Sequence, residues 1–456
     1  MKIKNRKNQK GALLIYLIII IAIFTMIMFP VVAVFSGKLH LLRTSIDREG
    51  ALQIAEAGIN YYQWHLAHFP NNYQNGTYDY IDYDTQQNIG KFSLTITPPL
   101  VGSTIVTVKS VGWTNNNPSV TRTISARFGV PSLAKYAFLS NDVIWIGENE
   151  SVSGQMQSNN GVRFDGYGNA PIQSAKEIYT CSESQGSPCP VVKNGVWGSA
   201  SEDVKSFWQF PVPAIDFSSI TSDLPTMKSD AQNGGIYLPP SNKQGYSLVF
   251  NSNGTVSVYK VRTLSSHSSG MDTSGVWHSE DTDYNRRDFQ YTTNIPTNGI
   301  IYIEDKVWVE GVVNGRVSVI AAKLPYSSSN APTIYIPKNI VYNSKDGDDV
   351  LGLIAQKDVV VSYSAPNDLE IDAAIISQNG GAQFFYYYGN IKNSITIYGA
   401  IMTFYQWTWT WVNSYGGVTS GYRNTSSIYD GNLLYNPPPS FPVSSSGYQI
   451  ISWTSD

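Results

Sequence analysis

The chain's five histidines are the side chains best suited to metal or acid–base chemistry. They are His40, His65, His68, His267 and His278. His65 and His68 are three residues apart, so on a helix they share a face, but no other ligand-type residue lies near them. The Gly/Ser-rich loop between His267 and His278 leads into an acidic run at residues 280–283, which could hold a cation. We favour the plainer interpretations, a solvated helix surface and a surface loop.

Two acidic groups could also carry chemistry. Asp346, Asp348 and Asp349 offer oxygen ligands on a turn, which suits Ca²⁺, but the spacing and closing glutamate of an EF-hand are missing, and a solvated turn is favoured. Glu370 and Asp372 are two apart, so on a strand they face the same side. Carbohydrate-active β-solenoid enzymes set acidic residues on such faces, although carboxylates on exposed strands are commonly solubilising.

Known catalytic motifs are missing from the sequence. It contains no GxSxG, HExxH, P-loop or dinucleotide-binding fingerprint. We therefore predict a non-enzymatic protein without a cofactor, with calcium at the 346–349 turn as the alternative.

The two cysteines, Cys181 and Cys189, enclose a short run of turn residues. A disulfide that clips a small loop fits an extracytoplasmic protein and stabilises it by about 2–3 kcal/mol. Metal ligation is the alternative, but two thiolates with no histidine nearby make a poor site. The disulfide is the prediction.

An aromatic run is the candidate binding surface. With a period of two, Tyr405, Trp407, Trp409 and Trp411 fall on one face of a strand, at about 6.8 Å spacing. If exposed, these rings form an adhesive patch for a sugar face, a partner subunit or a surface. If buried, they are core beneath the C-terminal tail. Both interpretations stay open.

The N-terminal segment indicates where these groups are placed. Residues 1–11 carry five basic side chains, and residues 12–37 are uncharged and mostly apolar. A helix of about 25 residues is about 37 Å long, enough to cross a hydrocarbon core of about 30 Å. The basic flank should stay in the cytoplasm and the remainder outside. A cleavable secretory signal is the rival interpretation, but its apolar region is shorter, about 7–15 residues.

An amphipathic stripe continues this helix beyond the anchor. Apolar residues recur at steps of three and four and define one helix face. They are Leu52, Ala55, Ile59, Tyr62, Leu66 and Phe69. We predict one long helix that is apolar, then polar, then amphipathic against a domain, and that ends before Pro70.

These N-terminal features resemble the type IV pilin-like family, in particular minor pilins of the PilX-like type. The residues that carry the resemblance are the leader ending in Lys10-Gly11, the anchor starting at Ala12-Leu13-Leu14, and the run Ala51-Leu52-Gln53-Ile54-Ala55-Glu56-Ala57-Gly58. The resemblance implies that a prepilin peptidase cuts between Gly11 and Ala12, and that the new amine of Ala12 is methylated. It also implies pilin-like subunits and pilus assembly machinery as partners.

The candidate assembly residues are Tyr16 and Glu56. The family usually has a glutamate five residues after the cut, which pairs with a neighbouring N-terminal amine, whereas this chain has Tyr16. A hydroxyl offers no charge for that pairing. The departure favours a minor or initiating subunit over a major filament subunit.

Composition limits the remaining possibilities. The chain has 456 residues and a net charge of −3. Without the five cations of the leader, 26 Lys and Arg residues face 34 Asp and Glu residues, a net charge of −8. No nucleic-acid-binding face is indicated. Few charges and many Tyr, Gly, Ser, Thr and Asn residues are typical of a turn-rich, all-β surface protein.

Strand patterns divide the part outside the membrane. Alternation at residues 92–96, 103–113 and 120–128 predicts a small antiparallel sheet under the striped helix, so that residues 38–130 form a pilin-like helix and sheet. Residues 131–456 show short strands that end in Gly, Asn or Asp. Their return at about twenty residues predicts a β-solenoid, with a β-sandwich as the alternative.

The second part resembles a group of uncharacterised domains found behind pilin-like stalks. The carrying residues include the runs 308–317, 351–356 and 369–374 and the proline-rich ending up to Trp453. This resemblance implies location and architecture but no activity. Residues 188–287 match nothing and are interpreted as an insertion between coils.

The prediction is a single-pass inner-membrane protein, mainly β with one long N-terminal helix, that displays its β-rich domain on the cell surface or a pilus. Filament or tip assembly and adhesion are the expected roles, with a surface glycan or a protein as ligand. The alternatives are a carbohydrate-active solenoid enzyme or carbohydrate-binding protein, and a static envelope protein with an uncut leader.

Overall fold

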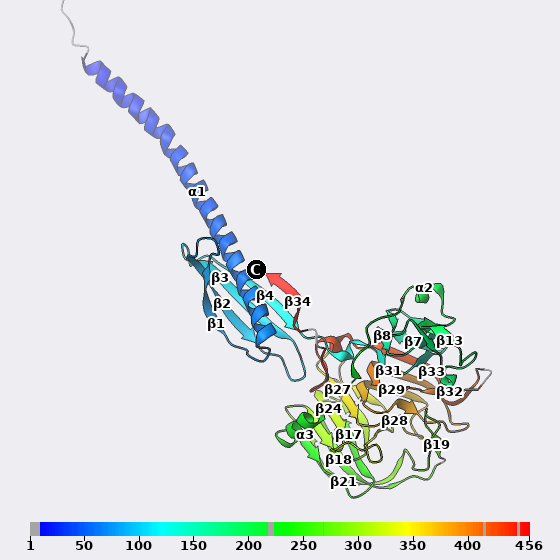
Figure 1. Cartoon of the computed structure of the whole chain (residues 1–456). Helices are drawn as coiled ribbons and strands as arrows, with labels where there is room; N and C mark the ends of the chain where they lie inside the picture. Colours follow the sequence, from blue (N-terminus) through cyan, green and yellow to red (C-terminus); the bar gives the residue numbers. More distant parts are fainter. Residues whose placement is uncertain (1–9, 218–222, 268, 414–415, 445–446) are drawn as a thin grey trace, which may run out of the picture. The chain divides into compact units, whose positions relative to one another are not determined.

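The computed structural model describes residues 10–217, 223–267, 269–413, 416–444 and 447–456 (Figure 1). The described chain forms two compact units. The first comprises Met1–Pro98, Val106–Phe128 and Ile450–Asp456, and the second comprises Pro99–Ile105 and Gly129–Gln449. The predicted fold class, mainly β with one long N-terminal helix, a small antiparallel sheet and a large β domain, is confirmed.

The first unit is built on a single helix, α1 (Lys10–His68), which continues through Pro30. The buried side chains of α1 all lie in its C-terminal third. They are Ala51, Ile54, Ala55, Ile59, Tyr62 and Leu66. This set shares Ala55, Ile59, Tyr62 and Leu66 with the predicted stripe, gains Ala51 and Ile54, and loses Leu52 and Phe69. Leu52 is half-buried while Ile54 is buried, and Phe69 is 51% exposed because the helix ends one residue before it.

The buried stripe packs on a five-stranded sheet with the order β1-β2-β3-β4-β34 (Figure 1). Its strands are β1 (Gly76–Ile81), β2 (Asn88–Thr97), β3 (Val106–Thr114), β4 (Thr121–Gly129) and β34 (Gln449–Ser455). The first four form an antiparallel meander, in which alternate residues face α1. The predicted strands correspond to β2, β3 and β4. β1 and the C-terminal strand β34 were not predicted.

Two glycines let the helix and sheet approach closely. A Cβ at Gly58 of α1 would lie 2.3 Å from Ser110 Oγ, and one at Gly112 of β3 would lie 2.4 Å from the carbonyl oxygen of Ala51. Both distances are far inside van der Waals contact. The small residues of the 51–58 run therefore set the distance between α1 and the sheet.

The second unit stacks its strands in parallel. One ladder of parallel pairs runs β16-β22-β24-β27-β29-β31-β5-β8-β11-β15. These strands are β16 (Ile236–Leu238), β22 (Ile300–Ile303), β24 (Arg316–Ala321), β27 (Val350–Ala355), β29 (Asp368–Ser377), β31 (Ile391–Thr403), β5 (Phe138–Ser140), β8 (Met156–Ser158), β11 (Ile172–Ser174) and β15 (Trp208–Gln209). Parallel stacking is the pairing that a solenoid requires, and it favours the solenoid over the sandwich.

The order of the stack differs from the order of the sequence. The chain enters the unit at β5 in the middle of the ladder and builds outward to β15. It then starts again at the opposite end with β16 and returns to the middle at β31. The predicted insertion, residues 188–287, therefore supplies strands at both ends of the stack.

Two further sides accompany this ladder. One contains β17 (Gly245–Asn251), β23 (Val307–Val313), β25 (Ile334–Ile336), β26 (Ile340–Tyr342), β28 (Val359–Val361) and β30 (Ala382–Phe384). The other contains β33 (Val418–Tyr429), β7 (Glu150–Ser153) and β10 (Tyr167–Gly168), with β6 (Ile144–Ile146), β9 (Val162–Phe164) and β14 (Val196–Trp197) as a separate parallel sheet.

Antiparallel pairs and short helices complete the unit. β18 (Thr255–Leu264) pairs with β17 and with β21 (Tyr284–Asn294), and β32 (Thr410–Val412) pairs with β33. Two hairpins are formed by β12 (Ile178–Thr180) with β13 (Val192–Asn194) and by β19 (Gly270–Met271) with β20 (Trp277–His278). The helices are α2 (Glu202–Lys205) and α3 (Leu224–Gln232), with 3₁₀ turns η1 (Leu133–Lys135), η2 (Glu183–Gln185) and η4 (Gly431–Leu434).

Candidate functional site

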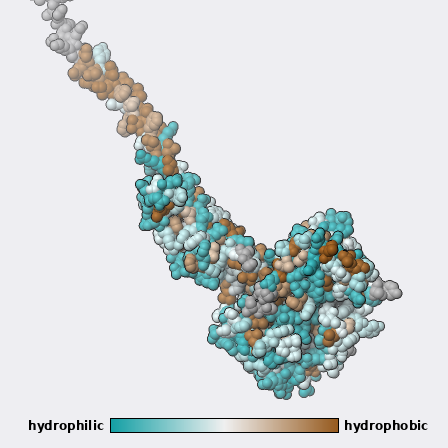
Figure 2. All heavy atoms as spheres, viewed as in Figure 1, coloured by the Kyte–Doolittle hydropathy of each residue, from teal (hydrophilic) through white to brown (hydrophobic). Residues whose placement is uncertain are grey.

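The N-terminal part of α1 is an uncovered apolar surface. Every described side chain at residues 13–43 is exposed, and Figure 2 shows a nearly continuous hydrophobic surface there. By length and composition, α1 can cross a membrane. Gly11 and Ala12 lie in its first turns, and the basic leader before Lys10 lies outside the described residues. Tyr16 is 67% exposed, and Glu56 is half-buried.

The predicted disulfide between Cys181 and Cys189 is present and clips a nine-residue loop. The Arg163 guanidinium donates to the carbonyl oxygens of Gln185 and Ser187, so this loop is also held from the neighbouring strand β9. The prediction of a small clipped loop is confirmed, and metal ligation by these sulfurs is excluded because they are bonded to each other.

The aromatic run does not form one exposed row. Residues 404–409 are not in a strand, so the assumed period of two applies only from Thr410 onward. Trp409 is fully buried, and Trp407 is buried and stacked on Phe138 at 4.6 Å between ring centroids. Only Tyr405 remains about half exposed. These four rings therefore do not share one exposed face: Trp407 and Trp409 have the alternative, core role, whereas Trp411 is half-buried and donates its Nε1 proton to the Phe384 carbonyl.

The carboxyl groups of the predicted acidic pair, Glu370 and Asp372, bind other residues of the second unit. Lys345 Nζ lies 2.9 Å from Asp372 and 3.1 Å from Glu370, and Asp372 also accepts from the Tyr342 amide. Burial raises the pKa of the Asp372 carboxyl, although those two contacts oppose the shift. The pair shares a face as predicted, but the Asp372 carboxyl is buried and bound by both Lys345 and the Tyr342 amide.

The acidic turn at residues 346–349 also accepts hydrogen bonds from backbone amides of the second unit. Asp349 is buried and accepts from the amides of Gly315 and Ser344. Asp346 accepts from the amide of Asp348. The turn is therefore solvated at Asp346 and Asp348, as favoured, but not at Asp349, and calcium at this turn stays an open alternative.

His65 and His68 point to different partners. His65 Nε2 lies 3.1 Å from the carbonyl oxygen of Asn72, and His68 Nδ1 lies 2.8 Å from that of Trp64. Both imidazoles thus contact backbone carbonyl oxygens near the C-terminal end of α1, which agrees with the interpretation as a helix surface.

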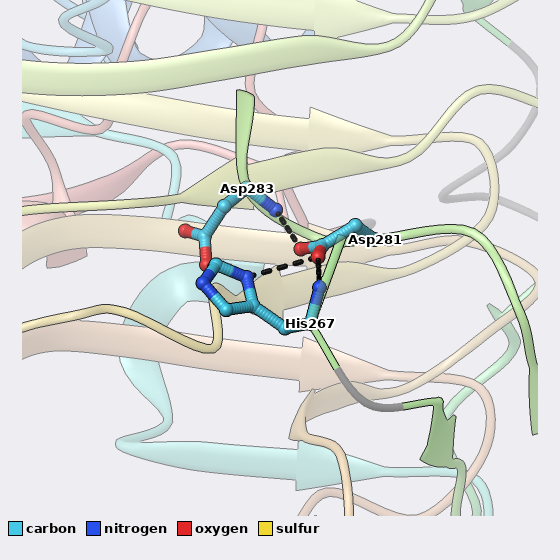
Figure 3. Close-up of side chains that lie close together, drawn as sticks. All are labelled: His267, Asp281 and Asp283. Atoms are coloured by element: carbon cyan, nitrogen blue, oxygen red, sulfur yellow. Dashed lines mark hydrogen bonds and ion pairs between the residues drawn. The ribbon is translucent and has the colours of Figure 1, made fainter. Parts of the chain in front are cut away.

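The loop at residues 265–283 forms a cluster that the sequence indicated only as a weak candidate. His267 follows β18, while Asp281 and Asp283 precede β21, so the three residues meet at the base of the loop (Figure 3). Their nearest ligand atoms all lie within 4.8 Å of one another. His267 Nδ1 is 2.9 Å from Asp281 Oδ2 and 3.5 Å from Asp283 Oδ2. We call these three residues the His–Asp–Asp cluster.

Residues of the stack form hydrogen bonds with residues 282 and 283 of this cluster's segment. Between the two aspartates, the Thr282 carbonyl accepts from Trp308 Nε1 and from Ser362 Oγ, both at 2.8 Å. The Ser364 amide donates to Asp283 at 2.9 Å. Burial raises the pKa of the Asp283 carboxyl; Ser364 opposes the shift, and the neighbouring Asp281 adds to it.

The same loop forms one wall of a polar cleft of about 470 Å³. His278 and Glu280 line it from the loop, and Tyr335, Asp358 and Phe385 lie deeper. Four lysines also line it: Lys243, Lys306, Lys323 and Lys357. This cleft could not be predicted from the sequence, because its lining comes from segments scattered between residues 240 and 385.

The charges of the cleft are unevenly paired. Lys306 pairs with Glu280, and Glu304 is held by Lys228 from outside the lining. Among the residues that the structure describes, no carboxylate lies within ion-pair distance of Lys243 or Lys323. Burial raises the pKa of Asp358, although the Gly381 amide and Lys357 oppose the shift. The lining thus holds as many acidic residues (Glu280, Glu304, Asp305 and Asp358) as lysines, and the ammonium groups of Lys243 and Lys323 lack a carboxylate partner among the described residues.

Comparisons with known proteins give little to add to this geometry. No protein-family model matches the chain, and no curated protein matches it. Among solved structures, the crystal structure of the competence-associated pilin ComZ from Thermus thermophilus aligns with 90% of this chain and 97% of its own, at 12% identity and a TM-score of 0.30. A score of this size does not establish a common fold.

Proposed function

We propose that this protein is a membrane-anchored, pilin-like surface protein without enzymatic activity. The segment of α1 at residues 12–37 holds the chain in the inner membrane until an assembly machine extracts it into a filament. The second unit is the displayed domain. Processing between Gly11 and Ala12 by a prepilin peptidase, followed by methylation of Ala12, is part of the proposal.

The observation that carries the proposal is the division of α1 into two halves. Its first half is apolar and exposed on all sides, which a soluble protein does not tolerate but a bilayer or a bundle of like helices does. Its second half buries one stripe on an antiparallel sheet. One helix thus serves both an apolar environment and a folded domain, as the resemblance to pilins implies.

Tyr16 narrows the role within such a filament. Its ring is exposed on the apolar half of α1, where the family usually has glutamate. A phenol cannot replace a carboxylate as the partner of a neighbouring amine in an apolar bundle. We therefore propose a minor or initiating subunit, present in low copy number.

N-terminal mass spectrometry tests the proposal on protein from the envelope and from sheared surface material. A chain that begins at methylated Ala12 in the sheared fraction is the expected result. A chain that still begins at Met1 and stays in the membrane fraction would support the static envelope protein instead.

Gly11→Val supplies the matched variant. A branched side chain at the cleavage position should block maturation, while the apolar run still inserts into the membrane. Gly37→Val lies at the other end of the run, with open space around it, and should mature normally. Normal cleavage of the Gly11→Val protein would contradict processing by a prepilin peptidase.

A second candidate function is binding of an anionic glycan in the polar cleft. The unpaired ammonium groups of Lys243 and Lys323 are the observation that favours it. The test compares retention of the protein on dextran sulfate and on neutral dextran, with Lys243→Ala/Lys323→Ala as the variant and Lys193→Ala/Lys260→Ala as the control. Equal retention of all three proteins would reject the cleft, and shortening of either polymer would reject a non-enzymatic role.

A further inference from the structure

The His–Asp–Asp cluster has the spacing of a metal site. In a tetrahedral site with metal–ligand bonds of about 2.0–2.1 Å, neighbouring ligand atoms are about 3.3 Å apart. The distances from His267 Nδ1 to the two carboxylate oxygens, 2.9 and 3.5 Å, bracket this value. Figure 3 shows the imidazole facing both carboxyl groups. The ligand atoms of all three residues lie within 4.8 Å of one another, so coordination requires the widest pair to move closer.

The carboxyl groups of the cluster accept from the backbone amides of His267, Asp283 and Ser364, but within the described chain they form ion pairs only with the imidazole. The side chains of Asp281 and Asp283 are only 5% and 9% exposed, and no Lys or Arg of the described chain forms an ion pair with either. Lys392 interacts electrostatically with Asp283, but its Nζ donates to the Ala365 carbonyl. A single imidazolium can neutralise one carboxylate, not two. Buried charge of this kind is costly unless it is paired or bound to a metal.

We propose that His267, Asp281 and Asp283 bind one divalent cation of the Zn²⁺ or Mn²⁺ type. An imidazole nitrogen with two carboxylate oxygens is a donor set that these metals accept, whereas Ca²⁺ and Mg²⁺ favour oxygen ligands. The imidazole must bind through Nδ1, so its proton moves to Nε2 or to solvent. The His267 side chain is one-third exposed, which leaves a position for water as the fourth ligand.

The cation would close the base of the loop at residues 265–283. Further out, Met271 exchanges backbone hydrogen bonds with Tyr386, and the Thr273 amide donates to Gln383. His278 and Glu280 of the same loop line the polar cleft. Because these contacts already hold the outer part of the loop against the stack, the cation would add a further link at its base and so a further restraint on that wall of the cleft.

The test uses the full-length protein in detergent, dialysed against a chelator and then titrated with ZnCl₂, MnCl₂ and CaCl₂ by calorimetry. We expect one Zn²⁺ per chain, at least 10-fold tighter than Ca²⁺. Asp281→Asn and Asp283→Asn should each weaken Zn²⁺ binding at least 30-fold. Asp272→Asn is the matched control, because Asp272 pairs with His278 at 2.8 Å on the same loop but without a second carboxylate.

Two measurements keep the outcome clear if an aspartate variant folds poorly. His267→Gln alters only the more exposed ligand and should also weaken binding at least 30-fold. Co²⁺ added to the wild-type protein should give the visible absorption of a low-symmetry site, displaced by one equivalent of Zn²⁺. Failure of the wild-type protein to bind Zn²⁺ or Mn²⁺ stoichiometrically, or loss of binding in Asp272→Asn but not in the cluster variants, would overturn the proposal.

Discussion

The two units of this chain build their cores in opposite ways. In the first unit, β1 to β4 follow one another in sequence and in space, and α1 covers them with a single stripe of residues. In the second unit, the first strand along the chain, β5, lies in the middle of the stack beside β31. The first core depends on local pairing and the second on contacts between residues more than 250 positions apart. Long-range contacts of this kind carry a larger entropic cost of closure and are hard to predict from sequence.

Trp308→Ala should give the largest effect and confine it to the second unit. The Trp308 ring is fully buried, stacks on Tyr335 at 4.9 Å between centroids and donates to the Thr282 carbonyl. Its removal should lower the free energy of unfolding of that unit by about 3–5 kcal/mol. Denaturant titration with limited proteolysis would show one transition moved and the α1 sheet intact.

The exposed Trp277 is the control for this experiment. Its side chain is 59% exposed, and Trp277→Ala should change stability by less than about 0.5 kcal/mol. A loss of the first unit's transition in Trp308→Ala would mean that the two units do not unfold separately.

Glu150→Gln should show that the second unit has its own dependence on pH. Burial raises the pKa of the Glu150 carboxyl to about 7, against the hydrogen bonds from Gly147 and Thr425. Between the unfolded pKa near 4.5 and the folded value near 7, the folded state binds more protons, so stability falls as pH rises. At pH 8 the glutamine variant should be more stable than the wild type by an amount on the order of 2 kcal/mol, and near pH 4 the two should be equal.

The first unit should respond in the other direction. Hydrogen bonds and the charge of Lys91 lower the pKa of Asp79, and hydrogen bonds from Thr85 lower that of Asp82. Their contributions are present above the ordinary aspartate pKa near 3.8 and are lost as pH falls below it. Thermal unfolding followed separately for the two units from pH 3 to pH 8 would check both signs. A second unit whose stability rises between pH 4.5 and pH 7 would contradict the account of Glu150.

Gly58→Val tests the close packing of the local core. The new Cβ would meet Ser110 and Phe92, so α1 must move away from β3 or the sheet must deform. We expect a loss of about 1–3 kcal/mol in the first unit and none in the second. Gly37→Ala, which meets nothing within 4 Å, is the helical control and should not destabilise the unit. An unchanged transition in Gly58→Val would show that the helix is not in tight contact with the sheet.

Removal of residues 449–456 should have the smallest effect. β34 pairs at the edge of β4, with contacts such as the Asp456 amide to the Thr123 carbonyl, but its side chains are mostly exposed. The deletion should cost about 1 kcal/mol and leave an unpaired edge that promotes association. Sedimentation and thermal unfolding would measure both changes. A loss comparable with that of Gly58→Val would make the C-terminal strand part of the local core.

Local signals predicted the helix and three strands well, because each shows its own periodicity in sequence. At the start of the stripe, Ala51 and Ile54 are buried in place of Leu52, and the end of the helix at His68 leaves Phe69 outside. β34 could not be predicted in the same way, because an exposed edge strand needs no apolar alternation. The aromatic run shows the opposite failure: its alternation was regular, but the chain leaves the strand at residues 404–409 and buries Trp407 and Trp409.

The amino-acid sequence alone determined the apolar segment at residues 12–37, the striped helix, the β-rich class of the second unit and the disulfide, because each depends on composition or short spacing. Only the tertiary structure decided the order of the stack, the burial of the tryptophans, the cleft and the meeting of His267 with Asp281 and Asp283. These features depend on which distant segments pack together. Which segments pack together depends on the total burial and hydrogen bonding of the whole unit, so it cannot be predicted from any single segment.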